Sequence, residues 1–159
     1  MNTVKEALRN ELITLKNARD ILQYSYDKCS LIGVRTGLTY EEMESYEALT
    51  SRFARLSDII IQKIFRFFDI LNLEATGTVR DRINRAEKIG VIESADKFVE
   101  IRILRNDIAH EYKSETIYEI FEQVLELTPT LLKSVENILT YSERYVGEAK
   151  EKQPLTSEP

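Results

Sequence analysis

The chain of 159 residues is 43% hydrophobic and 31% charged, with a formal net charge of −5, as expected for one soluble globular domain of ordinary size. No apolar run approaches the roughly 20 residues that a membrane span requires, so the composition predicts no membrane-spanning segment. The single cysteine, Cys29, excludes an internal disulfide, and with an N-terminus that lacks a secretory signal it favours the cytoplasm.

Apolar residues recur along the chain at spacings of three and four, the period of an amphipathic helix, rather than at the spacing of two typical of strands. We therefore predict an all-α protein with five helical segments. In chain order these cover residues 3–32, 39–74, 78–90, 94–110 and 116–145, with a kink or restart of the last helix at Thr128-Pro129.

Threonines mark the starts of three of these helices. Each is followed three positions later by an acidic residue, which is the spacing of reciprocal N-terminal capping. The pairs are Thr39 with Glu42, Thr78 with Asp81, and Thr116 with Glu119. The core-facing stripe predicted for the second helix consists of Leu49, Phe53, Leu56, Ile60, Ile64, Phe67 and Leu71.

Long helices joined by short connections favour antiparallel neighbours, so the expected architecture is an antiparallel four-helix bundle with an additional short helix. Residues 1–146 would form this single domain. The polar, proline-containing segment 147–159 is expected to be a mobile tail.

The only histidine of the chain lies in the segment Arg105-Asn106-Asp107-Ile108-Ala109-His110-Glu111-Tyr112. Histidine exchanges protons near neutral pH, and arginine is a permanent cation suited to binding phosphate. The two residue types together suggest chemistry on a phosphodiester.

Charge along the sequence is uneven, which permits a phosphate-binding surface despite the acidic total. Residues 1–50, 51–110 and 111–159 carry net charges of −2, +2 and −5. Within the basic middle third, Arg52, Arg55, Lys63 and Arg66 fall in a band of about 80° beside the apolar stripe of the second helix. This band is either an RNA track or an ordinary solvated helix face.

On a regular helix Arg105 projects among apolar residues, where an unpaired guanidinium would be costly. It therefore needs a carboxylate, a set of carbonyls, or a wet cleft in which a phosphate is its partner. His110 lies about 140° away, on a second partly apolar face beside Val99 and Ile103. Such a helix is either enclosed by its own bundle or placed at a dimer seam.

Arg105 and His110 of one regular helix cannot easily reach the same phosphate. Either the helix unwinds near Ala109, or a two-fold axis brings the motifs of two chains together. Symmetry would also supply two histidines, one as the base and one as the acid of a metal-free cleavage of RNA.

The Arg-x4-His-x-Tyr pattern of Arg105, His110 and Tyr112, in an all-helical chain, resembles the HEPN superfamily and most closely its HepT-like toxins. The resemblance covers residues 1–145, and Asn106 supplies the polar residue expected after the arginine. It implies a homodimeric, metal-independent endoribonuclease without a cofactor. Its substrate would be RNA, with tRNA the favoured class. The resemblance also implies a toxin–antitoxin pair in which a minimal nucleotidyltransferase of the MNT family attaches AMP to Tyr112.

In that interpretation His110 exchanges the protons, Arg105 stabilises the phosphorane, and Asn106 orients one of them, with Arg102 and Asp107 as supporting residues. Structural roles are the alternatives. His110 could cap the helix, Tyr112 could be core, and Arg105 could pair with Asp107, Glu100 or another helix. The chain could also be a non-catalytic companion of a nucleotidyltransferase, or a helical interaction module. Neither a metal site nor a membrane contact is predicted.

Overall fold

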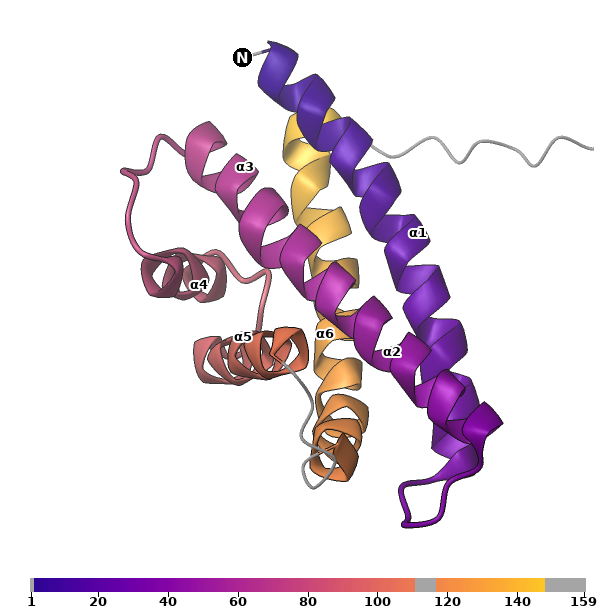
Figure 1. The fold of residues 1–159 in the computed structure, drawn as a ribbon. Coiled ribbons are helices and arrows are strands. Elements are labelled where there is room, and N and C mark those ends of the chain that lie inside the picture. The colour runs from indigo at the N-terminus through magenta and orange to yellow at the C-terminus, as the bar shows by residue number, and fades with distance from the viewer. Residues whose placement is uncertain (1, 111–116, 148–159) are drawn as a thin grey trace, which may run out of the picture.

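The computed structural model describes residues 2–110 and 117–147, and within them the chain is an all-α helical bundle without strands (Figure 1). The all-α prediction is confirmed. The helices are α1 (Asn2–Ile32), α2 (Tyr40–Asp58), the π-helix η1 (Ile59–Ile64), α3 (Phe65–Leu71), α4 (Val79–Lys88), α5 (Ala95–Ala109) and α6 (Ile117–Val146).

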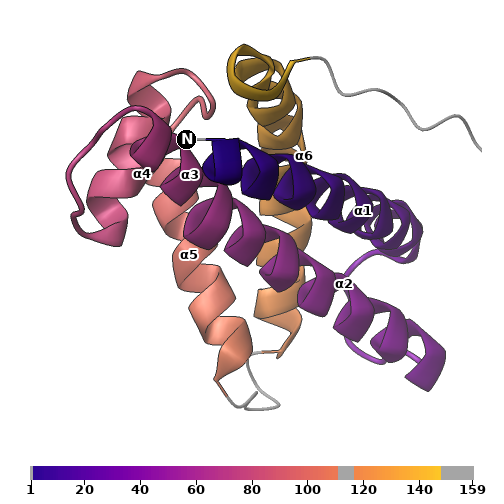
Figure 2. The same ribbon diagram turned by 90° about the horizontal axis from the view of Figure 1, so that it is seen from above.

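α2, η1 and α3 follow one another without a break and form one rod, which passes α1 and α6 along the long axis of the molecule (Figure 1). α1 packs on both α2 and α6. The shorter α4 and α5 run at a steep angle to these rods (Figure 2). α5 packs on α2 and α6, which places the Arg105 motif against the middle of the bundle.

Side chains from the rods and from α5 fill a shared core, which buries the apolar stripe of α1 at Leu8, Leu12, Leu15 and Leu22. From α5 the core takes Phe98, Ile101 and Leu104, and from α6 it takes Phe121, Val124, Leu131, Val135 and Ile138. The removal of this apolar surface from water is the main term that stabilises the bundle.

The π-helix η1 shifts the register of the central rod. The amide of Phe65 donates to the carbonyl of Ile60, five residues earlier, so this stretch holds about one residue more than an α-helix would. Residues after it are rotated by about 100° from their α-helical positions. The stripe predicted to continue through Phe67 therefore continues through Phe68, which is buried, while Phe67 is only half-buried.

Two of the three predicted capping pairs are present. The Thr39 hydroxyl accepts from the Glu42 amide and the Glu42 carboxylate accepts from the Thr39 amide, and Thr78 and Asp81 do the same. These amide donors lower the pKa of both carboxyls. Thr116 lies outside the described residues.

A kink or a restart was predicted at Thr128-Pro129, and the restart is wrong, because α6 is one helix from Ile117 to Val146 with Pro129 inside it. Proline leaves one carbonyl of the preceding turn without an amide donor. The hydroxyl of Thr128 donates to the carbonyl of Val124 at 2.5 Å, so it satisfies a neighbouring acceptor at this point.

Hydrogen bonds from the Tyr46 hydroxyl connect α2 to the end of α1. We expect Tyr46→Phe, which removes them, to lower the free energy of unfolding by about 1–2 kcal/mol. Its fully buried phenol lies 2.6 Å from the Gly33 carbonyl and 3.2 Å from that of Cys29. Urea unfolding would measure the loss. Tyr40→Phe is the matched control because Tyr40 is 92% exposed. Equal stabilities for the two variants would contradict this role.

Burial also raises the pKa of Tyr46 to about 12, above the value of about 10 expected in the unfolded chain. The folded state therefore favours the neutral phenol. The stability that this preference adds is complete below pH about 10 and is lost as the pH approaches 12. Unfolding at alkaline pH should show this loss in the unmodified chain and less of it in Tyr46→Phe.

Candidate active site

A cleft of about 680 Å³ is lined by residues of α1, of α5 and of the junction of α2 with η1. Four of its lining residues are cationic and one is acidic. The lining residues are Thr14, Arg55, Ser57, Asp58, Ile59, Ile61, Gln62, Lys63, Arg102, Arg105 and Asn106. The cleft therefore has a net positive wall in a protein whose total charge is negative.

Arg105 reaches across the cleft to Asp58 at the end of α2. Its Nε and Nη2 donate to the two carboxylate oxygens at 2.6 and 2.8 Å, a bidentate pair. These hydrogen bonds raise the pKa of the guanidinium. The side chain of Arg105 is 31% exposed, so the cation is paired and still accessible from the cleft.

Arg55 and Arg102 have neither an ion pair nor a side-chain hydrogen bond with any residue that the structure describes. Lys63 lies 3.7 Å from the carboxylate of Glu11. With Arg105 paired with Asp58, the guanidinium groups of Arg55 and Arg102 remain in the cleft without an anionic partner among the described residues. A ligand phosphate would provide the anion that these groups lack.

The π-helix forms one wall of the cleft through Ile59, Ile61, Gln62 and Lys63. Arg82 of α4 donates to the carbonyl of Ile61 at 3.4 Å. π-helices within α-helices are frequent at functional sites, where they change the direction of side chains. The wall is therefore an irregular backbone segment that is held by a hydrogen bond from α4.

Asn106 lines the cleft beside Arg105, and His110 does not. α5 ends at Ala109, and His110 is exposed and extended at φ −85° and ψ 149°. Its backbone amide still donates to the Asn106 carbonyl at 3.2 Å. The helix therefore ends where one of the two alternatives placed an unwinding, but His110 is not turned back into the cleft.

The other predicted site residues also divide into those that line the cleft and those that do not. Arg102 lines the cleft, whereas Asp107 is exposed outside it. Tyr112 lies outside the described residues. Ile103, on the second apolar face of α5, is 56% exposed, so the described residues do not enclose α5 completely. The alternative environment, a dimer seam, stays a prediction.

Sequence reasoning missed Asp58 as the partner of Arg105, having named Asp107, Glu100 or an unspecified residue of another helix. A signal was present, because Asp58 is the only acidic residue between Glu47 and Asp69. It sits among the basic residues of the band on the second helix. A lone carboxylate in a cationic helix segment marks a place where a cation from elsewhere can be held.

No family model matches the chain, and no curated protein matches it significantly. The resemblance to the HEPN superfamily therefore stays a prediction based on residues 105–112. In the described part of the chain, no helix is long and apolar enough to cross a membrane. The same residues contain no group of three or more His, Cys, Asp or Glu side chains suited to holding a metal ion.

A double-mutant cycle would measure the Arg105–Asp58 pair. We expect Arg105→Gln and Asp58→Asn to show a coupling free energy of about 0.5–1 kcal/mol, since both side chains are partly exposed and solvent screens them. The coupling should fall at high salt. The control cycle combines Asp58→Asn with Arg102→Gln and should give a smaller value. Equal couplings in both cycles would contradict a specific pair.

Proposed function

We propose that the chain is a metal-independent endoribonuclease of the HepT-like HEPN kind, the toxin of a toxin–antitoxin pair. One observation carries the proposal: Arg105 and Asn106 of the Arg-x4-His motif line a cleft together with Arg55, Lys63 and Arg102. A motif that served only to end a helix would not need a cationic cleft around its arginine. Such a cleft suits a substrate made of linked phosphates.

In the proposed reaction, the 2′-hydroxyl oxygen of a ribose attacks the adjacent phosphorus while a base removes its proton. The bond from phosphorus to the 5′-oxygen breaks, and an acid protonates that oxygen. The products are a 2′,3′-cyclic phosphate and a free 5′-hydroxyl. His110 is the residue suited to exchange these protons near neutral pH, and Arg105 would stabilise the charge on the phosphorane.

A homodimer would complete this site. His110 lies outside the cleft of its own chain, and each chain has one histidine for a reaction that uses both a base and an acid. The exposed Ile103 provides an apolar contact on the same helix. We propose that two α5 helices meet near a two-fold axis, so that each His110 approaches the cleft of the partner.

Regulation by a nucleotidyltransferase of the MNT family is part of the same proposal, on the resemblance alone. Tyr112 follows His110 by two residues, so AMP attached to Tyr112 would add a phosphate two residues from the proposed catalytic histidine. The added anion would compete with RNA for the cations of the cleft. Transfer RNA is the proposed substrate class.

We expect the unmodified chain to cleave total tRNA in excess EDTA, and His110→Ala to lose at least about a hundred-fold in rate because its proton donor and acceptor is gone. Gel analysis of the RNA and a test for cyclic phosphate ends would measure this. Arg66→Gln, which removes an exposed cation outside the cleft, is the control. Intact tRNA with the unmodified chain, confirmed free of AMP by mass spectrometry, would instead favour a non-catalytic companion of a nucleotidyltransferase.

The modification has its own test, in which the chain is incubated with ATP and an MNT-family nucleotidyltransferase encoded beside it. Mass spectrometry should find AMP on the unmodified chain and none on Tyr112→Phe. Tyr118→Phe is the control, because it keeps Tyr112 and removes another tyrosine nearby in sequence. AMP on Tyr112→Phe, or on neither protein, would contradict the proposed acceptor.

A further inference from the structure

A second hollow, of about 420 Å³, continues from the cleft along the seam between α1 and α2. It shares Thr14 and Arg55 with the cleft, so the two spaces adjoin. Its lining consists of Thr14, Asn17, Ala18, Ile21, Ser51, Arg52 and Arg55 and includes no acidic residue. We call this hollow the α1–α2 groove.

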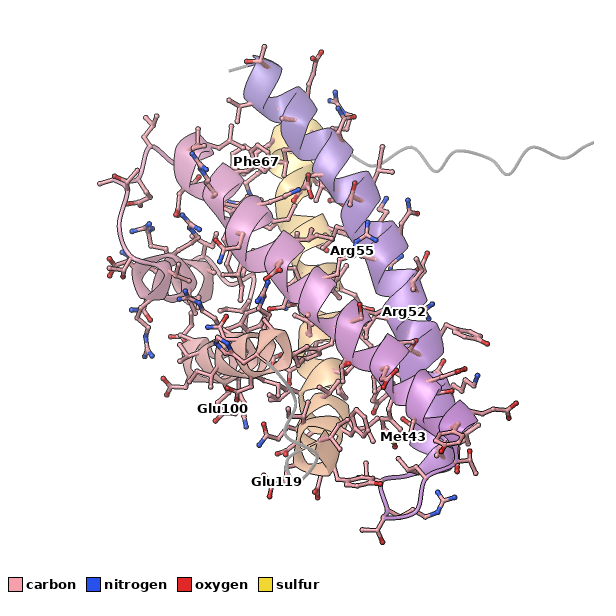
Figure 3. All side chains as sticks on the ribbon, in the orientation of Figure 1. Met43, Arg52, Arg55, Phe67, Glu100 and Glu119 are labelled. Atoms are coloured by element: carbon pink, nitrogen blue, oxygen red, sulfur yellow. The ribbon has the colours of Figure 1, made fainter. Side chains whose placement is uncertain are left out.

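The two arginines of the groove differ in how they are held. Arg52 is half-buried and donates to the Ser25 hydroxyl at 2.6 Å and to the Ile21 carbonyl at 3.5 Å, which fixes its direction across the seam. Arg55 is exposed and has no partner among the described residues. Figure 3 shows both side chains where α2 passes α1. Positive charge therefore extends from the cleft along this seam.

The α1–α2 groove ends where acidic residues replace the arginines in the lining. A third hollow, of about 480 Å³, shares Arg52 with the groove and contains Glu41, Glu42 and Glu44 in its lining. From Lys63 to Arg52 the rod advances by about 16 Å. That length corresponds to about five nucleotides of a stacked strand. Just beyond the groove, Tyr24 lines the third hollow, is 64% exposed and offers a ring on which a terminal base can stack.

The structure also divides the basic band predicted from sequence. Arg52, Arg55 and Lys63 line the cleft or the groove, and Arg66 lines neither. The reason is the π-helix, which rotates the residues after it by about 100°. Arg66 is therefore a natural control, an exposed arginine on the same rod that points away from the seam.

We propose that the α1–α2 groove binds the single-stranded RNA on one side of the scissile bond, as part of a path of about five nucleotides that runs through the cleft and the groove. The inference rests on the proposed function for the identity of the reacting bond. A strand that passes through the cleft must leave it, and the adjoining groove offers cations for phosphates and the apolar Ala18 and Ile21 for sugars and bases. An acidic protein segment is the competing occupant and becomes an outcome of the test.

Binding is measured by fluorescence anisotropy with fluorescein-labelled oligouridylates of about four and about ten nucleotides, using the full chain with His110→Ala so that the probe stays intact. We expect Arg55→Gln to weaken binding of the longer probe about three- to ten-fold, and more than that of the shorter one. The slope of log affinity against log salt should fall by about 0.7, one phosphate contact. Arg66→Gln should change the affinity less than about two-fold.

A second pair of variants tests the end of the groove without changing charge. Tyr24→Ala should weaken binding of the longer probe by at least about five-fold through lost stacking, and Tyr40→Ala, which removes an exposed tyrosine that lines neither the groove nor the third hollow, should not. Equal losses for Arg55→Gln and Arg66→Gln, or for the two tyrosine variants, would overturn the proposal. The proposal would also be overturned if the chain bound no RNA but bound poly-glutamate with an affinity that depended on Arg55.

Failure of the groove and failure of the ribonuclease give different results. If the affinity for RNA depends on probe length, on Arg55 and on Tyr24, but the chain cleaves no RNA, the groove proposal is supported and the ribonuclease proposal is overturned. If the chain cleaves RNA but its affinity for RNA does not depend on probe length, on Arg55 or on Tyr24, the ribonuclease proposal stands and the groove proposal is overturned. The cleavage assay uses unmodified chain in EDTA, so neither readout depends on the other.

Discussion

The rod from Tyr40 to Leu71 packs on every other described helix, so its register decides which side chains each of them meets. Before the π-helix it presents Leu49, Phe53 and Leu56 to the core, and after it Phe65 and Phe68. The wall of the cleft lies between these two sets. Core packing on both sides holds the irregular turn in place, which is how a less favourable hydrogen-bond pattern can persist in a folded protein.

Local sequence signals predicted the helices well, because periodicity and capping are short-range properties. The capping pairs at Thr39 and Thr78 formed as their spacing indicated. The shift from Phe67 to Phe68 was not predicted, since a helical wheel assumes one constant rotation per residue. Asp58 was missed because its partner is 47 residues away, and spacing carries no information about contacts between helices.

The candidate site was predictable only in part. The sequence identified Arg102, Arg105 and Asn106, and all three line the cleft. It named Arg55 and Lys63 only as part of a separate basic band, because the packing of the second helix on the fourth predicted one is a tertiary property. The position of His110 outside the cleft follows from the end of α5 at Ala109. The proposed action of His110 on a partner chain cannot be recognised from one chain's periodicity, because the partner's surface is absent from the helical wheel.

Because of the π-helix, the shape of the cleft wall can vary independently of how the helices pack in the core. η1 behaves as an α-helix that holds one surplus residue, with the excess placed at the wall formed by Ile61 and Gln62. Loss of one residue between 59 and 64 would restore α-helical hydrogen bonding while Phe53 and Phe68 kept their orientation toward the core. Gain of a residue would rotate α3 away from that core. The segment is therefore tolerant of deletion and intolerant of insertion, so the cleft wall can change shape without a change in how the bundle packs.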